Sequence, residues 1–331
     1  MKYDQKKAEL GKRLFFDPRL SGDVSMSCAT CHNPAKGFSD GKALSDAYPG
    51  TKGFRNTPTL INTAHKEVWF HDGRIGTNLN DITRDQLTET IWMNMDMRVM
   101  QERLKQDPVY VRLFKEAGFG EPSNGAVRKA IPEYMKSLAS INDPFDQHRM
   151  SKAAKRGMGL FLGQAECVLC HNGPMFTDGK AHNLGVPENP RIFAEPLRHV
   201  AFIAFTSWMG VQNYMNLRQD PGAMVRNNDP AERGKFITPT LRELKHTAPY
   251  MHNGTFKTLS QVVAFYNRGG GEDPNKDRAL KRLRLNRKQR SDLVAFLLAL
   301  SGSQLTGPKY VLKQKIDIKY KPIPDWWNAR N

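Results

Sequence analysis

The stretch Cys28-Ala-Thr-Cys31-His32 decides the fold, and it recurs as Cys167-Val-Leu-Cys170-His171. Together the two pentapeptides contain all 4 cysteines of the 331 residues. Two thiols separated by two residues and followed by a histidine form the attachment signature of a c-type haem. The thiols bond to the two vinyl groups of one haem, and the imidazole binds its iron. The sequence therefore predicts two covalently bound haem c groups, with His32 and His171 as iron ligands.

Other uses of a Cys-x-x-Cys pair fit this chain less well. A zinc half-site, a disulfide and a thioredoxin-like dithiol are the alternatives. A four-cysteine zinc site does not need a histidine after each pair, and a catalytic dithiol normally occurs once. We therefore assign Cys28, Cys31, Cys167 and Cys170 to haem attachment.

The composition is that of a globular protein with a strong basic excess. Hydrophobic residues make up 39% of the chain and charged residues 25%, and the length favours two domains. No run of about 20 apolar residues occurs, so we expect no membrane span. The formal charge of +17 favours an acidic partner. The haem motifs argue against nucleic acid, and we expect that partner to be a redox protein.

The haem motifs also indicate a cellular compartment. In bacteria, thioether attachment of haem accompanies protein export. The chain begins Met1-Lys-Tyr-Asp-Gln-Lys-Lys7, without the apolar core of a signal peptide. We therefore expect the numbering to be that of a mature protein, and its location to be the periplasm.

Short motifs recur in the same order after each haem motif, which indicates an imperfect duplication. They are Phe38-Ser-Asp-Gly41, Thr57-Pro-Thr-Leu60 and His71-Asp-Gly73 in the first half, and Phe176-Thr-Asp-Gly179, Thr238-Pro-Thr-Leu241 and His252-Asn-Gly254 in the second. The last two blocks are offset by 181 positions (238 − 57 and 252 − 71), but the haem motifs by only 139 (167 − 28). The second half therefore carries an insertion, which we place between Gly185 and Ala231.

Apolar spacing predicts helices over residues 8–16 and 152–162, each leading into a haem motif. Thr258-x-x-Gln261 is a capping box for a helix that ends at Gly269. Asn286 caps another helix, which ends near Gly302. We expect an all-α protein with few or short strands. Its two cytochrome c-like haem domains are predicted over residues 1–145 and 146–305, followed by a tail over 306–331.

Five further motifs support a family resemblance. They are Gly11-Lys-Arg-Leu-Phe-Phe-Asp17, Arg55-Asn-Thr-Pro-Thr59, Asp72-Gly-Arg74, Asp143-Pro-Phe-Asp146 and Thr247-Ala-Pro-Tyr250. With them, most of the chain resembles the bacterial dihaem cytochrome c peroxidase and MauG superfamily. The resemblance implies an open N-terminal haem where hydrogen peroxide reacts, a six-coordinate C-terminal haem that transfers electrons, and a calcium ion between them.

The resemblance also implies axial ligands. The sixth ligand of the C-terminal haem is a methionine in the peroxidases and a tyrosine in MauG, and the matching position here is Tyr266. A phenolate stabilises oxidised iron, which would let the two haems share a high-valent state. The alternative is that Tyr266 continues an apolar helix face and that Met251 or Met224 is the ligand. Many peroxidases of the family block the first haem with a loop histidine, and none occurs between His32 and Phe54. Both features favour the MauG-like branch.

The family cleaves peroxide with a glutamine and a glutamate ten residues apart, which correspond to Gln86 and Asp96. An amide can hold the peroxide while a carboxyl group transfers its proton. Glu89 and Glu102 are alternatives for the acid, and a surface position for Asp96 is a further alternative.

Two family tryptophans are replaced. The one between the haems corresponds to His71, with Trp69 two residues earlier, so we expect electron transfer between the haems to take a different route. MauG's exit tryptophan corresponds to Ala165. Trp208, Trp326 and Trp327 are other candidates for a surface exit.

The calcium ligands of the family correspond to the side chain of Asn56 and the backbone carbonyls of Thr247 and Pro249. Such oxygen ligands suit a hard cation.

The resemblance implies an enzyme that uses peroxide as electron acceptor. We expect a MauG-like oxidoreductase that oxidises a protein partner by long-range electron transfer. One alternative is a cytochrome c peroxidase that reduces peroxide with electrons from a small cytochrome. The other is a dihaem electron carrier without enzymatic activity.

Overall fold

The computed structural model describes residues 3–302, 304 and 305. These residues are mostly helical with a few two-residue strands, so the expected all-α class is confirmed. The helices are α1 (Gln5–Phe15), α2 (Cys28–Cys31), α3 (Leu79–Thr88), α4 (Met97–Lys105), α5 (Pro108–Glu116), α6 (Asn124–Ser137), α7 (Lys152–Leu162), α8 (Arg191–Ala194), α9 (Pro196–Trp208), α10 (Leu259–Asn267) and α11 (Arg287–Ala299). The strands are β1 (Ser140–Ile141), β2 (Ala181–His182), β3 (Phe236–Ile237) and β4 (Gln304–Leu305).

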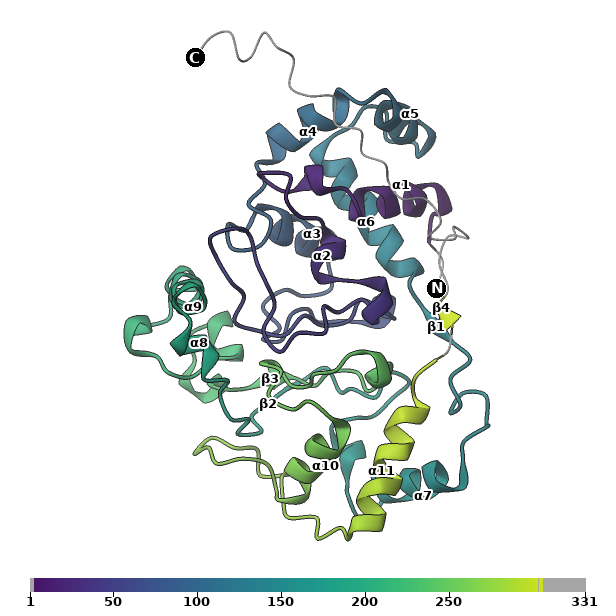
Figure 1. Ribbon diagram of the computed structural model, residues 1–331, viewed down its shortest axis with the longest axis vertical. Helices are drawn as coiled ribbons and strands as arrows, with labels where there is room; N and C mark the ends of the chain where they lie inside the picture. The colour runs from purple at the N-terminus through teal and green to yellow at the C-terminus, as the bar shows by residue number, and fades with distance from the viewer. Residues whose placement is uncertain (1–2, 303, 306–331) are drawn as a thin grey trace.

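One crossing of two helices organises each half. Helices α1 and α6 cross in the upper part of Figure 1, and α7 and α11 cross in the lower part. Each crossing brings a glycine against a neighbouring backbone. A Cβ atom on Gly11 would lie 2.0 Å from the carbonyl oxygen of Ala130, and one on Gly157 would lie 2.0 Å from that of Asp292. The duplication seen in the sequence is therefore also a duplication of packing.

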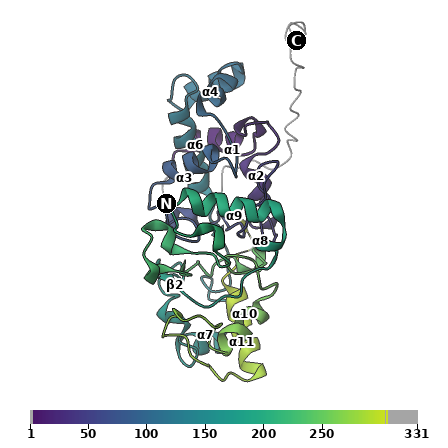
Figure 2. The ribbon, with the colours of Figure 1, turned by 90° about the vertical axis from the view of Figure 1, so that its left-hand side faces the viewer.

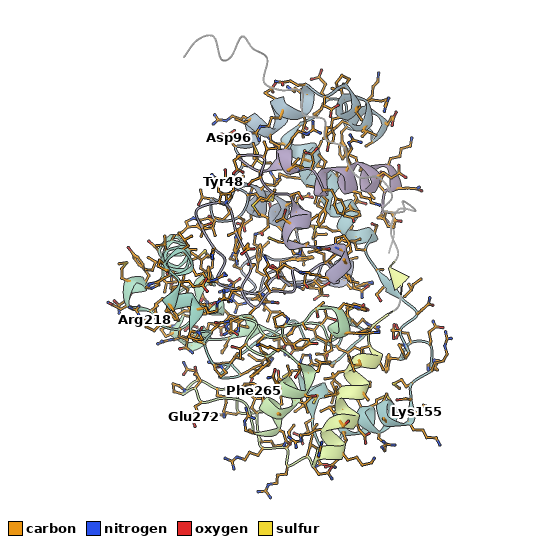
Figure 3. The ribbon with its side chains drawn as sticks, viewed as in Figure 1. Tyr48, Asp96, Lys155, Arg218, Phe265 and Glu272 are labelled. Carbon is orange, nitrogen blue, oxygen red and sulfur yellow. The ribbon has the colours of Figure 1, made fainter. Side chains whose placement is uncertain are left out.

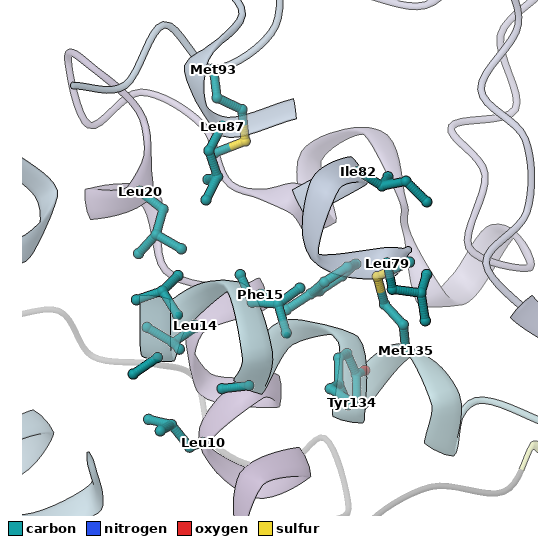
Figure 4. Close-up of a cluster of buried hydrophobic side chains, with 14 of the residues drawn as sticks. Leu10, Leu14, Phe15, Leu20, Leu79, Ile82, Leu87, Met93, Tyr134 and Met135 are labelled. Atoms are coloured by element: carbon teal, nitrogen blue, oxygen red, sulfur yellow. The ribbon is translucent and has the colours of Figure 1, made fainter. Parts of the chain in front are cut away.

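The core of the first half lies where α1, α3 and α6 meet (Figure 4). Phe15 is fully buried at its centre, and its ring packs edge-on against Tyr134 with 5.2 Å between centroids. The buried side chains of α1 recur at helical spacing, at Leu10, Leu14 and Phe15. The second half has a separate core around Phe161, Phe176 and Phe296.

The insertion expected between Gly185 and Ala231 contains α8 and α9, which lie beside the junction of the two halves (Figure 2). It packs mainly on the first half. The ring of Phe54 contacts Phe202 and Phe205 of α9, with centroid distances of 5.5 and 5.2 Å. A segment that follows the second haem motif in sequence therefore covers part of the first half in space.

The strands join segments that are distant in sequence. β1 pairs antiparallel with β4, placing Ser140 opposite Leu305, and β2 pairs antiparallel with β3, placing His182 opposite Phe236. The first pair ties the end of the first half to the residues after α11.

The local helix predictions agree with the structure. α7 has the predicted bounds, the capping box at Thr258 is formed, and Asn286 caps its helix as predicted. α1 begins three residues earlier than predicted, at Gln5, because Asp4 caps it. Trp326 and Trp327 of the predicted tail lie outside the described residues. Among the described helices, none has the length and apolar character needed to cross a membrane.

The crossing of α7 and α11 generates a stability prediction. Gly157→Ala should lower the thermal unfolding midpoint of the haem-loaded protein, because the new methyl group meets a backbone carbonyl, and overpacking of this kind costs about 1–3 kcal/mol. Gly159→Ala is the matched control on the same helix. No atom lies within 4 Å of its added Cβ, so improved helix propensity should stabilise the protein by about 0.5–1 kcal/mol. Equal effects of the two variants would contradict the close crossing.

Candidate functional site

The two predicted haem-ligating histidines have the same local geometry. His32 follows α2, and its Nδ1 lies 3.0 Å from the carbonyl oxygen of Phe38. The Nδ1 of His171 lies 2.9 Å from the carbonyl oxygen of Phe176. A carbonyl only accepts, so Nδ1 carries the proton in both rings and Nε2 keeps the lone pair that a metal needs. Burial lowers the pKa of His32 to about 4 and also lowers that of His171, which favours the neutral ligand form.

Each haem motif opens onto its own cavity. The N-side cavity, of about 170 Å³, is lined by Cys28, Cys31 and His32. The C-side cavity, of about 310 Å³, is lined by Cys167, Cys170 and His171. Attachment thiols and an available imidazole nitrogen therefore line one wall of each cavity. The donor groups of each cavity are therefore those that a covalently attached haem c needs.

A short shared wall separates the two cavities. The residues that line both are Asn56, Thr57, Pro58, Thr59, Lys66 and His71. His71 donates from Nε2 to the carbonyl oxygen of Asn56 at 2.8 Å, since that carbonyl can only accept. The backbone N–H of Asn56 donates in turn to the carbonyl oxygen of His252 at 2.6 Å. The structure thus places His71 between the cavities, where electron transfer between two haems would pass.

Gln86 of α3 lines the N-side cavity. Its Nε2 is buried and has no hydrogen-bond partner in the described part of the chain. An unpartnered buried amide is costly, and a polar ligand in the cavity would remove that cost. This is the position expected of a group that holds peroxide.

The structure differs from the expectation for Asp96. Its carboxylate is the N-cap of α4, accepts from the backbone N–H groups of Arg98 and Val99 at 2.8 and 3.2 Å, and pairs with the Arg98 guanidinium at 2.8 Å. The side chain lies at the edge of the molecule (Figure 3) and does not line the N-side cavity. Its hydrogen bond with Arg98 holds the pKa of Asp96 well below its usual range, which suits a cap and not a proton shuttle.

The alternative acids do not replace Asp96. Glu102 is exposed and pairs with Lys105 at 3.0 Å, and Glu89 ends α3 and bonds the hydroxyl of Thr90 at 3.1 Å. Among the described residues, no aspartate or glutamate lines the N-side cavity. Its charged wall residues are all cations, Arg55, Lys66 and Arg74.

Tyr266 projects from α10 into the C-side cavity that also holds His171. Burial raises the pKa of its hydroxyl, so the phenol is neutral in the absence of a metal. The two alternative methionines lie apart from each other. Met251 lines the same cavity, whereas Met224 packs against the apolar cluster of the insertion. Tyr266 and Met251 therefore remain the candidates for a sixth ligand.

The expected calcium ligands Asn56, Thr247 and Pro249 all line the C-side cavity. The Nδ2 of Asn56 donates to the carbonyl oxygen of Lys42 at 2.6 Å. This bond leaves the side-chain oxygen available for a cation. Oxygen donors from both halves therefore line one cavity.

The structure also locates the residues considered for a surface electron exit. Ala165 is buried in the wall of the C-side cavity, and Trp208 is 57% exposed at the end of α9. Sequence reasoning missed Lys66, which lines both cavities, and Glu188, which lines the C-side cavity. Only the duplication offered a signal for His252, the repeat partner of His71. Its ring stacks on Phe236 at 3.7 Å.

Comparisons with known proteins agree with this geometry. Residues 5–154 match the profile of the di-haem cytochrome c peroxidases. The chain is 49% identical over 318 residues to cytochrome-c peroxidase IdrP2 of Denitromonas iodatirespirans, covering 92% of this chain and 86% of that protein. It is 34% identical over 304 residues to the methylamine utilization protein MauG of Methylorubrum extorquens, covering 89% and 78%.

Solved structures show the same architecture. A MauG-like protein associated with microbial copper homeostasis superimposes with a TM-score of 0.78 at 25% identity, covering 91% of each chain. The diheme peroxidase BthA from Burkholderia thailandensis superimposes with a TM-score of 0.73 at 23% identity, covering 91% of this chain and 87% of that one. This second likeness shows the fold alone.

The C-side cavity generates a ligand prediction. If the Tyr266 oxygen binds the second iron, Tyr266→Met should change the spectrum of the low-spin haem and raise its reduction potential, because a thioether favours reduced iron. Optical spectra and a potentiometric titration of the haem-loaded protein would measure both. Tyr250→Phe is the matched control, since Tyr250 lines the same cavity but donates its hydroxyl to the carbonyl oxygen of Leu244 at 2.8 Å. An unchanged spectrum and potential in Tyr266→Met would make Met251 the ligand to test next.

Proposed function

The chain belongs to the di-haem cytochrome c peroxidase family, and we propose that it reduces hydrogen peroxide at the haem bound by His32 with electrons from a protein partner. The family implies two haem c groups, whose irons supply the redox chemistry. The observation that carries the proposal is the unpartnered amide of Gln86 in the N-side cavity. Reduction consumes two electrons and two protons for each peroxide and yields two waters.

Gln86 positions the peroxide in this proposal. Its Nε2–H groups donate to a peroxide oxygen, since within the described part of the chain this nitrogen has no hydrogen-bond partner of normal geometry. Arg74 lines the same cavity, and its guanidinium lies 3.0 Å from Asp72 and 3.6 Å from Asp85. These ion pairs hold its guanidinium in a fixed orientation in the wall of the cavity where peroxide would bind. The first half of the chain therefore binds the substrate.

The second half takes up the electrons. His171 and Tyr266 line its cavity, and His71 lies in the wall shared with the first cavity. A neutral imidazole at this place shortens the gap that an electron crosses between the two cofactors. Asn56, Thr247 and Pro249 would hold a calcium ion beside the same wall and keep its geometry rigid.

A MauG-like reaction is the second candidate, in which the partner protein is itself the substrate and is oxidised at long range. The presence of Tyr266 in the C-side cavity favours it, because a phenolate ligand would stabilise oxidised iron. Trp208 is exposed, and an electron taken from that partner could enter this chain through it. The greater identity to a cytochrome-c peroxidase, 49% against 34% for MauG, favours the peroxidase reaction.

We place the protein in the periplasm, because thioether attachment of haem accompanies export. The net charge of +17 favours an acidic redox protein as the electron partner.

The N-side cavity generates a kinetic prediction. Gln86→Leu should lower kcat/KM for hydrogen peroxide by about 100-fold, the typical effect of removing one preorganised donor. Asp96→Asn should stay within about threefold of wild type, because a hydrogen-bonded cap contributes to helix stability and not to the cavity. Steady-state turnover with a reduced cytochrome c as donor measures both. A large loss in Asp96→Asn would show that this carboxylate enters the cavity during turnover, against the geometry found here.

The charge of the chain generates a prediction about the partner. The rate of oxidation of an acidic donor protein by peroxide should fall about tenfold or more between low and high ionic strength, because salt screens the attraction. A small neutral donor is the control and should show no such dependence. Salt-independent turnover of the acidic protein would argue against electrostatic steering.

These experiments also separate the peroxidase from its alternatives. Fast turnover of a reduced small cytochrome supports peroxide reduction, whereas a covalent change in the donor protein supports the MauG-like reaction. A resting ferric spectrum with two low-spin haems would leave no open site for peroxide and would indicate an electron carrier.

A further inference from the structure

Lys66 is a cation without a counter-charge at the junction of the two cavities. It lines both of them, and no carboxylate of the described chain lies within ion-pair distance of its ammonium group. Burial lowers its pKa to about 8, which reflects the missing partner. The Lys66 side chain is half-buried and lines both cavities. It therefore presents to both cavities a positive charge that a carboxylate of a bound group would balance.

The other cations of the two cavity walls are already paired. Their partners are Asp72 and Asp220 for Arg55, Asp72 and Asp85 for Arg74, Asp143 and Asp146 for Arg242, and Glu166 for Lys281. Among the described lysines and arginines of these walls, Lys66 alone has no carboxylate. It is also the only lysine among them that faces both cavities.

Trp69 provides a second, independent donor beside it. Trp69 is 4% exposed and lines the N-side cavity, and its buried Nε1 has no hydrogen-bond partner among the residues that the structure describes. The ammonium group of Lys66 lies 5.2 Å from the centroid of its ring. Backbone hydrogen bonds hold both residues in place. The backbone N–H of Lys66 donates to the carbonyl oxygen of Thr63 at 3.0 Å, and the backbone N–H of Trp69 donates to that of Ile75 at 2.9 Å. Two neighbouring donors beside the N-side cavity therefore lack an acceptor within the described part of the chain.

We propose that Lys66 and Trp69 form a carboxylate-binding site for haem propionates. The Trp69 N–H and the Lys66 ammonium hold a propionate of the haem bound by His32, and the same ammonium pairs with a propionate of the haem bound by His171. Propionates are the carboxylates that two haems bring to these cavities, and charge-assisted hydrogen bonds to such groups are strong. The inference rests on the two-haem content that the family implies, and not on the identity of the electron partner.

The site would couple the electron affinities of the two irons. A positive charge near a propionate disfavours the more positive ferric iron, so Lys66 favours reduction of both haems. The Trp69 N–H withdraws charge from one propionate and acts on one haem. Lys66 would therefore link two cofactors that have no protein ligand in common.

The test is a potentiometric titration of the haem-loaded protein in which both haems are followed by their optical spectra. Lys66→Gln should shift both reduction equilibria toward the ferric form by roughly tenfold, because one positive charge is lost beside each propionate. Trp69→Phe should shift only the equilibrium of the haem bound by His32, by a smaller factor. Lys66→Arg keeps the charge and should restore both equilibria to within about threefold of wild type.

Lys281→Gln is the matched control. Lys281 lines only the C-side cavity and pairs with Glu166 at 2.7 Å, so its loss should shift the His171 haem alone or neither haem. If Lys66→Gln shifts neither haem, the carboxylate site is wrong, and if it shifts only one, the bridge between haems is wrong. If Lys66→Gln fails to retain both haems, Trp69→Phe decides: a shift of the His32 haem supports the site, and no shift overturns it. A wild-type protein with fewer than two haems by pyridine haemochrome absorbance would instead contradict the proposed function.

Discussion

The ion pairs of Arg55 hold together the segments that separate the two cavities. Its guanidinium donates from Nε and Nη2 to Asp220 at 2.7 Å each and from Nη1 to Asp72 at 2.5 Å. All three side chains are buried. Removing one member would strand a buried charge, which typically destabilises a protein by about 3–5 kcal/mol. Asp72 comes from the first half and Asp220 from the insertion, so the triad joins segments 165 positions apart. The adjacent Asn56 is part of the shared wall. Its carbonyl oxygen accepts from His71, and its backbone N–H donates to the carbonyl oxygen of His252.

The two halves illustrate how a duplicated site becomes two different ones. The proximal side is unchanged, since His32 and His171 both donate from Nδ1 to the carbonyl of a phenylalanine. The remaining walls have diverged. The N-side cavity has the unpartnered amide of Gln86, and the C-side cavity has the phenol of Tyr266. The first arrangement suits binding of a small polar substrate, and the second suits a closed, electron-transferring iron.

Interactions between near neighbours could be predicted from the sequence. The capping box at Thr258 and the cap at Asn286 formed as expected because a cap involves residues only three positions apart. Asp96 shows the limit of this reasoning. Its ten-residue spacing from Gln86 is a property of the sequence, but the direction of its carboxylate depends on where α4 begins. A short acidic side chain before a helix is a strong N-cap, and capping turned the group toward Arg98 and away from the cavity.

The sequence by itself determined the positions of the two haem c motifs and of the histidines predicted to bind iron, the helical class and the duplication. These depend on local chemistry and on periodicity along the chain. Only the tertiary structure decided that the insertion packs on the first half, that His71 and Lys66 lie between the cavities, and that Asp96 does not line one. The physical reason is that a charge or donor acquires its role from the partners that it has or lacks in space. Lys66 resembles any other lysine in the sequence, and its unpaired state at a shared wall becomes visible only after the surrounding carboxylates have paired with other cations.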